Sequence, residues 1–150
     1  MKKLSLFFTS ALILGLSSCS KDDSSESSFN AAALQGKWNF NTERTLIDGV
    51  EIGPAATYSG NANDCSNDYL EFNANNISVW GDFESNQGEC DLFLYDGTYS
   101  VNGNTINLIS EGESFIYNVV SHTATTMTVQ DVYTFEGSTY IDEFTFVKVQ

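Results

Sequence analysis

The stretch Leu34-Gln35-Gly36-Lys37-Trp38-Asn39-Phe40 opens the first strand that this sequence predicts. From it, apolar and polar side chains alternate through residues 37–47, which is the period of a half-buried β-strand. One face of that strand is expected to carry five side chains, namely Trp38, Phe40, Thr42, Arg44 and Leu46. A short helical turn within residues 30–35 is expected to lead into it.

Seven further strands are predicted by runs of β-forming side chains bounded by Gly, Asn, Asp and Ser. They cover residues 68–73, 77–84, 90–101, 104–110, 114–121, 127–135 and 139–149. Asn102-Gly103 is a strong hairpin signal, whereas residues 48–67 form a long first loop. Short turns without a crossover helix predict an all-β fold, an eight-stranded antiparallel up-and-down barrel. A two-sheet sandwich is the structural alternative.

The N-terminus has the order of features found in exported lipoproteins. Met1-Lys2-Lys3 is positively charged, residues 4–16 are mostly apolar, and Leu16-Ser17-Ser18-Cys19 resembles the bacterial lipobox. The apolar run is shorter than the about 20 residues that span a bilayer, as in a signal peptide. We therefore predict a lipoprotein signal peptide over residues 1–18 and lipidation of Cys19. An ordinary signal peptide with an incidental cysteine is the alternative.

Residues 19–33 are predicted to be the lipidated cysteine and a flexible tether, because residues 20–28 contain no apolar side chain. Ser20-Lys21-Asp22-Asp23 resembles an acidic export tag that places lipoproteins on the outer face of the outer membrane in one group of Gram-negative bacteria. The resemblance implies anchoring by acyl chains such as palmitate, outer-membrane localisation and surface exposure. A plain soluble linker is the alternative.

The chain after cleavage is strongly acidic. Loss of Lys2 and Lys3 leaves four basic residues against 20 acidic ones, so the formal net charge goes from −14 to −16. This argues against nucleic-acid binding, which needs a basic surface to replace counterions on phosphate. Residues 34–150 have the length of one domain, and we expect a monomer.

Cys65 and Cys90 are the two cysteines left after Cys19, and an even number in an exported chain predicts a disulfide. A zinc site is not predicted, since the cysteines lack CxxC spacing and His122 is the only histidine. An Asn- and Asp-rich cluster in the first loop is read as turn-forming rather than calcium-binding: Asn61, Asn63, Asp64, Asn67 and Asp68. No cofactor motif is present.

Gly36-Lys37-Trp38, the eight strands, the cysteine pair and the terminal segment Phe144-Thr145-Phe146-Val147-Lys148-Val149 resemble the lipocalin-like domains of bacterial surface lipoproteins. The resemblance covers residues 34–149. It implies that Trp38 plugs the closed end of the barrel and that a basic residue of the last strand, Lys148, packs on it. Gly36, Trp38 and Lys148 are thus its structural signature.

We expect a non-enzymatic binding protein for a small apolar ligand. The candidate lining residues are Phe40, Leu70, Phe72, Phe83, Phe93, Tyr95, Tyr117, Tyr133 and Phe144. Alternatively, the same aromatics fill a solid core. The protein would then be an envelope component that docks a partner protein through an apolar patch at residues 92–95. A hydrolase using carboxylates such as Asp142, which we expect at the barrel rim, is a third hypothesis.

Overall fold

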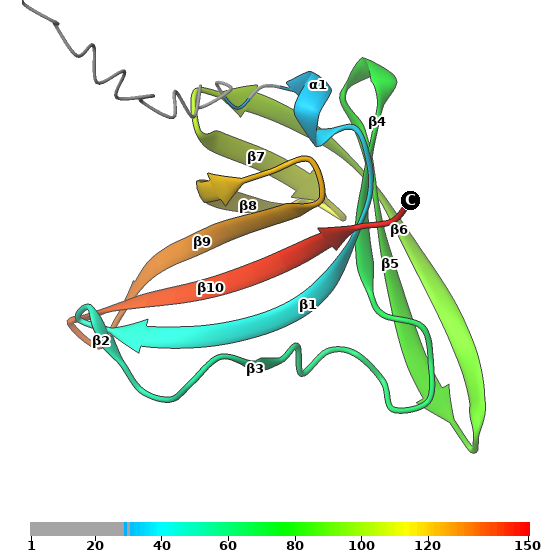
Figure 1. Cartoon of the computed structure of the whole chain (residues 1–150), viewed down its shortest axis with the longest axis horizontal. Helices are drawn as coiled ribbons and strands as arrows, with labels where there is room; N and C mark the ends of the chain where they lie inside the picture. Colours follow the sequence, from blue (N-terminus) through cyan, green and yellow to red (C-terminus); the bar gives the residue numbers. More distant parts are fainter. Residues whose placement is uncertain (1–28, 30) are drawn as a thin grey trace, which may run out of the picture.

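The alternating strands close into an antiparallel barrel in the computed structural model, which describes residue 29 and residues 31–150 (Figure 1). The predicted signal peptide, Cys19 and the export tag lie outside the described residues. Eight strands form the wall: β1 (Gly36–Ile47), β4 (Tyr69–Asn73), β5 (Ile77–Asn86), β6 (Glu89–Asn102), β7 (Thr105–Ser110), β8 (Glu113–His122), β9 (Thr126–Phe135) and β10 (Ser138–Lys148). The barrel prediction is confirmed.

Each wall strand pairs with the next one along the chain, and β10 pairs back with β1, from Trp38 opposite Lys148 to Ile47 opposite Tyr140. This last pairing closes the sheet on itself, so the sandwich alternative does not apply. The short strands β2 (Val50–Glu51) and β3 (Ala56–Thr57) pair with β1. A 3-10 turn, η1 (Ala74–Asn76), joins β4 to β5. No helix in the described part of the chain is long and apolar enough to cross a membrane.

A β-bulge in β1 changes which of its side chains face inward. The pairing with β10 shifts between Phe40 and Thr42. Beyond the shift, Thr45 lies opposite Asp142 and donates a hydrogen bond to it from Oγ1 (2.6 Å), whereas Arg44 pairs with Glu143 on the other face. The expectation that Thr42, Arg44 and Leu46 share the face of Trp38 is therefore wrong, because the extra residue of a bulge reverses the alternation.

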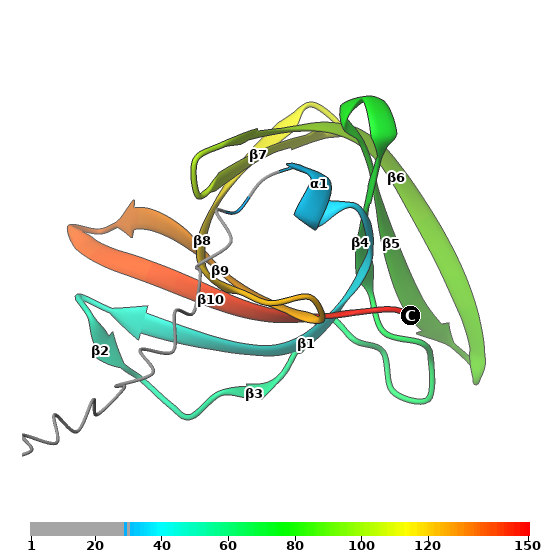
Figure 2. The same cartoon turned by 45° about the horizontal axis from the view of Figure 1, so that its top comes forward.

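One end of the barrel is closed by α1 (Ala31–Leu34), which lies across the opening of the ring in Figure 2. Leu34 and Trp38 are fully buried, and the Trp38 Nε1 donates a hydrogen bond to the Leu34 carbonyl (2.7 Å). The Lys148 Nζ lies 4.8 Å from the Trp38 ring centre. Gly36 has φ +113°, and a Cβ there would lie 3.0 Å from the Lys148 Cε. The three signature residues therefore meet at the closed end, where glycine is required.

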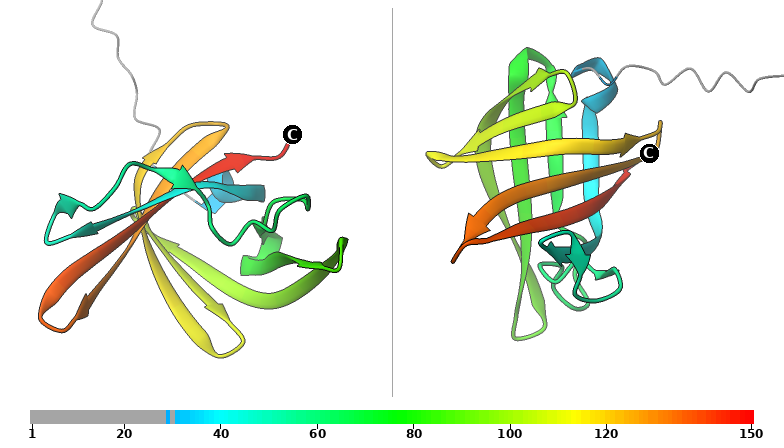
Figure 3. Two further views of the ribbon diagram at one scale, coloured as in Figure 1. Left: turned by 90° about the horizontal axis from the view of Figure 1, so that it is seen from below. Right: turned by 90° about the vertical axis from the view of Figure 1, so that its left-hand side faces the viewer.

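The other end is open, because its hairpins spread apart instead of converging (Figure 3, left). The long loop between β1 and β4 lies at this end. Its Tyr58 stacks on Phe40 with 4.3 Å between ring centres, and a disulfide joins Cys65 of the loop to Cys90 of β6. The predicted cysteine pair is thus bonded, and it fixes the loop to the extended β5–β6 hairpin.

Candidate functional site: a pocket at the open end

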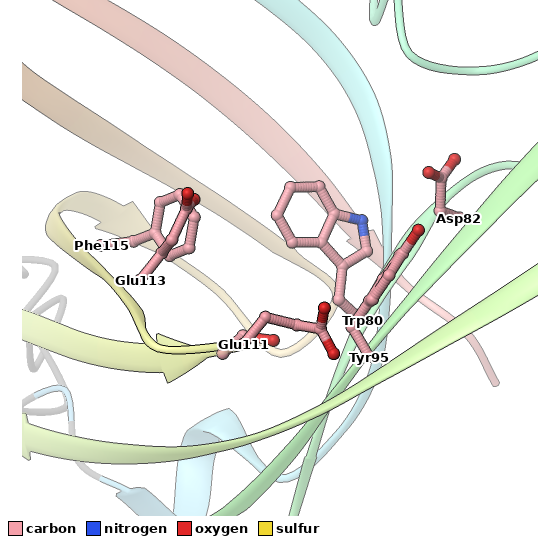
Figure 4. Close-up of a pocket in the computed structure, with 7 residues that line it drawn as sticks. Trp80, Asp82, Tyr95, Glu111, Glu113 and Phe115 are labelled. Atoms are coloured by element: carbon pink, nitrogen blue, oxygen red, sulfur yellow. The ribbon is translucent and has the colours of Figure 1, made fainter.

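A pocket of about 320 Å³ lies in the open half of the barrel, between the β5–β6 wall and the β7–β8 hairpin (Figure 4). Three aromatic residues, three acidic residues and one serine line it: Trp80, Tyr95, Phe115, Asp82, Glu111, Glu113 and Ser110. This volume falls at the lower end of the range for small-molecule sites.

Strand register aims the lining side chains inward. Trp80 lies directly opposite Tyr95, and residues directly opposite in an antiparallel pair point to the same face. Farther toward the closed end, Ser78, Gly97 and Ser110 lie opposite one another on three adjacent strands. A Cβ on Gly97 would lie 2.4 Å from the Ile109 carbonyl oxygen. This row of small residues is closely packed, so a larger side chain at Gly97 would not fit there.

A layer of aromatic rings closes the barrel beside the pocket. Ring centres lie 6.0 Å apart for Phe115 and Trp80, 6.0 Å for Trp80 and Phe40, and 6.0 Å for Phe40 and Phe144. Tyr117 completes the circuit at 6.4 Å from both Phe144 and Phe115. Phe40 is 2 % and Tyr117 6 % exposed. The barrel therefore has a filled closed half and a hollow open half.

The inner face of the open half is acidic. Besides the three acids of the pocket, Asp131 of β9 and Asp142 of β10 lie directly opposite each other. Burial, then the charge of Asp142, raises the pKa of the Asp131 carboxyl above its usual value. Burial, then the charges of Asp68, Glu43 and Asp82, raises the pKa of Tyr58 to about 12. Burial is the main cause of both pKa shifts, and neighbouring carboxylates are the second.

The Trp80 indole is a hydrogen-bond donor without an acceptor. Its Nε1 is buried, and no acceptor contacts it among the described residues. A buried donor left unpaired costs free energy, so this wall of the pocket is not optimised for stability alone.

The predicted lining residues occupy several levels. Phe40, Leu70 and Phe72 belong to the buried core, Tyr117 and Phe144 belong to the aromatic layer, and Tyr95 lines the pocket. Phe93 and Tyr133 are about half exposed on the spreading hairpins, at 42 % and 44 %. Asp142, expected at the rim, lies on the inner face opposite Asp131 and accepts the hydrogen bond of Thr45.

Phe83 does not line the pocket. It lies beside Tyr69, with 6.4 Å between ring centres, on the outer face of β5. The inner face of β5 carries Ser78, Trp80 and Asp82 instead. The apolar alternation of residues 77, 79, 81 and 83 therefore marks the outside of the barrel here, which misled the assignment of Phe83.

Sequence reasoning missed Trp80, Phe115 and the pocket acids Asp82, Glu111 and Glu113. The available signal was the spacing of these residues. Trp80 and Asp82 are two residues apart and therefore share one face of their strand, and so do Glu113 and Phe115. Aromatic and acidic side chains that share a face are typical of a wet, ligand-accessible surface, whereas a core face is apolar throughout.

The metal alternatives have no ligand set within the described residues. His122 packs edge-on against Phe29, with 5.4 Å between ring centres. No group of three or more His, Cys, Asp or Glu side chains within this part of the chain is arranged to hold a metal ion. In the first loop, Asn61 and Asn67 each donate an Nδ2 hydrogen bond to the Phe40 carbonyl, which is the structural role expected of turn-forming residues.

Comparison with known proteins identifies the family. Residues 34–129 match the family model of the lipocalin-like domain. A lipocalin-like protein from Bacteroides uniformis has a similar structure, with a TM-score of 0.52 and 15% identity over 78% of this chain and 99% of that chain. A protein from Bacteroides eggerthii has a TM-score of 0.48 and 12% identity over 77% of this chain and 99% of that chain.

Bovine odorant-binding protein, in complex with a selenium-containing odorant, gives a TM-score of 0.46 and 16% identity over 83% of this chain and 76% of that chain. At these identities the likeness to solved structures concerns the fold. No curated protein sequence matches this chain. The chain belongs to the family of lipocalin-like domains, because the family model matches more than half of it.

Proposed function

Starting from membership of the lipocalin-like family, we propose that this protein is a non-catalytic binding protein that holds a small ligand with an apolar body in the open half of its barrel. The observation that carries the proposal is the pocket of about 320 Å³ bounded by Trp80, Tyr95 and Phe115. Aromatic walls favour an apolar body. The disulfide joins the first loop to β6, one of the strands that form the pocket wall.

The pocket adjoins the structural core, because Trp80 and Phe115 pack against it, but the pocket residues are less deeply buried than the core. Trp38, Phe72 and Phe146 are fully buried toward the closed end and stabilise the fold. Phe115, in contrast, is partly exposed and lines the pocket. Ligand binding and folding can therefore be tested by different substitutions.

A fluorescent apolar probe tests this proposal. The purified chain can be titrated with neutral N-phenyl-1-naphthylamine, whose aromatic body matches the aromatic lining of the pocket. Phe115→Ala is expected to weaken binding at least tenfold. Ile116→Ala is the matched control, because Ile116 is the next residue on β8 and is 52 % exposed on the outer face. Absence of binding to the unaltered domain, or equal loss in both variants, would contradict the proposal.

We further propose that the domain is held at a membrane by lipid on Cys19, with the residues between Cys19 and α1 as the tether, and is displayed on the outer surface of the outer membrane. The lipobox-like Leu16-Ser17-Ser18-Cys19 supports this. Labelling of cells with a palmitate analogue is expected to mark the protein and to fail with Cys19→Ser. If the barrel is displayed on the cell surface, protease added to whole cells should digest it. Protection of the barrel from the protease would contradict surface exposure.

An exposed apolar patch favours a second candidate function, the docking of a partner protein. Leu92 and Leu94 are 44 % and 58 % exposed on the outer face of β6, beside the partly buried Phe83. Such a patch on an extended hairpin is typical of an interaction surface. Cross-linking on cells is expected to give an adduct that Leu94→Glu abolishes and Phe115→Ala leaves intact. The reverse pattern would contradict this function.

A further inference from the structure

We propose that the ligand of this pocket is an organic cation: an ammonium group joined to an aromatic body, as in an arylalkylammonium compound. The inference rests on the proposed function and specifies its ligand class. It follows from the charge of the pocket walls, the placement of the described basic side chains and the exposed aromatic surface beside the acids.

Three carboxylates line the pocket, from two separate parts of the wall. Asp82 comes from β5, Glu111 from the β7–β8 turn and Glu113 from the start of β8. Figure 4 shows them with the rings of Trp80, Tyr95 and Phe115, on the same hollow. A small aromatic body held between these rings would place an attached ammonium within the field of the carboxylates.

The described basic side chains are all engaged elsewhere. The Lys37 Nζ lies 3.3 Å from the Tyr69 ring centre, Arg44 bonds Glu51 and Glu143, and Lys148 lies over Trp38. Within residues 29 and 31–150, both ion pairs involve Arg44, so no described cation neutralises the pocket acids. The negative potential of the pocket is therefore available to a ligand.

The aromatic walls suit a cation as well as an apolar body. Trp80 and Phe115 meet edge-to-face, at 75°, so their rings are not stacked against each other. Ring faces attract ammonium groups, most strongly the face of tryptophan. Trp80 is only partly buried, so part of its ring surface is open to the pocket that it lines.

The same field disfavours anions. Asp131 and Asp142 face each other on the opposite wall and add negative charge to the cup. A carboxylate ligand such as a fatty acid would enter without a described counterion and would be repelled by both walls. The pocket thus selects by charge. Its affinity should be highest for a cation, lower for a neutral molecule and lowest for an anion.

Three probes with one aromatic body and different charges test this order: tyramine (cation), tyrosol (neutral) and 4-hydroxyphenylacetate (anion). Titration calorimetry of the purified full chain at low ionic strength is expected to give tyramine the highest affinity, at least tenfold above tyrosol. The anion should not bind measurably. Added sodium chloride should reduce the tyramine advantage, because salt screens the carboxylates.

Isosteric neutralisation locates the effect. Asp82→Asn and Glu113→Gln should each reduce tyramine affinity several-fold and leave tyrosol affinity unchanged. Asp96→Asn is the matched control, because Asp96 is exposed on β6, next to Tyr95 but on the outer face. It should leave both affinities unchanged.

Equal affinity for tyramine and tyrosol, or preference for the anion, would overturn the cation inference and leave the proposed function standing. Absence of binding by all three probes would also overturn it. Retained binding of N-phenyl-1-naphthylamine would then show that the pocket still takes apolar ligands. Loss of that probe as well would overturn the proposed function itself.

Discussion

The substitution Trp38→Phe is expected to destabilise the barrel strongly without altering the pocket. Trp38 is fully buried, and its indole makes two contacts that a phenyl ring cannot reproduce in full. Its Nε1 donates to the Leu34 carbonyl at 2.7 Å, and its ring lies under the Lys148 Nζ at 4.8 Å. Both contacts hold the closed end together.

The magnitude follows from three losses. Losing the buried hydrogen bond costs about 1–2 kcal/mol, since the Leu34 carbonyl keeps its burial but loses this donor. The smaller ring removes buried surface and leaves a small cavity, costing about 1–2 kcal/mol. Weaker attraction for the Lys148 ammonium adds about 0.5 kcal/mol. The expected loss is about 3 kcal/mol of unfolding free energy, or a fall in Tm of roughly 10 °C for a domain of this size.

Urea denaturation followed by circular dichroism measures this loss. Lys148→Met keeps most of the side-chain stem, removes the charge and should cost only about 0.5–1 kcal/mol, which separates the ammonium contribution from the plug itself. A loss below about 1 kcal/mol for Trp38→Phe would refute the reasoning. Because the chain has two tryptophans, the variant also leaves Trp80 as the single fluorescent reporter in the pocket.

Three further outcomes are expected. Cys65→Ser, which opens the disulfide to Cys90 across a separation of 25 residues, should cost about 3 kcal/mol in urea denaturation, and reduced wild type should match it. Asp131→Asn should stabilise the barrel at pH 7 by about 0.5 kcal/mol, by removing the repulsion from Asp142. The pKa of Asp131 is raised in the folded protein, so the unfolded chain loses the Asp131 proton at lower pH. The wild type therefore loses stability as pH rises through the folded pKa of Asp131. Thermal unfolding at pH 3 should show no difference, because the raised pKa of Asp131 leaves its carboxyl protonated there. Gly97→Ala should cost about 1–3 kcal/mol, because its Cβ would lie 2.4 Å from a backbone oxygen, and a smaller loss would show that β7 can shift.

The sequence predicted the barrel well because its strands alternate cleanly and its turns carry specific residues. Asn102-Gly103 marks the β6–β7 turn, and Gly103 has φ +57°. The bulge in β1 could not be predicted, since one extra residue leaves no mark in the hydropathy pattern. It is fixed by tertiary hydrogen bonds: Asn61 and Asn67 of the loop both donate to the Phe40 carbonyl just before it.

The inner face of the open half could not be predicted for a different reason. Alternation shows that a strand has two faces but not which one points inward, and the hydrophobic face is normally taken as the inner one. In β5 this choice fails beyond Ser78, because the inner face is lined with Trp80 and Asp82, whereas Tyr69 covers Gly81 outside. Only closure of the barrel decides between the two faces.

Repulsion among the acids of the open half is expected to lower the stability of the barrel. Burial raises the pKa of Asp131, so part of its charge is held where solvent screens it poorly, and Asp142 faces it. Substitution by amides would relieve this repulsion at little structural cost, and natural proteins retain such positions when their stability is sufficient. The closed half, with Trp38 and Phe146 fully buried, supplies stability that tolerates the cost. A bound cation would reduce the repulsion, so ligand binding and barrel stability should rise together.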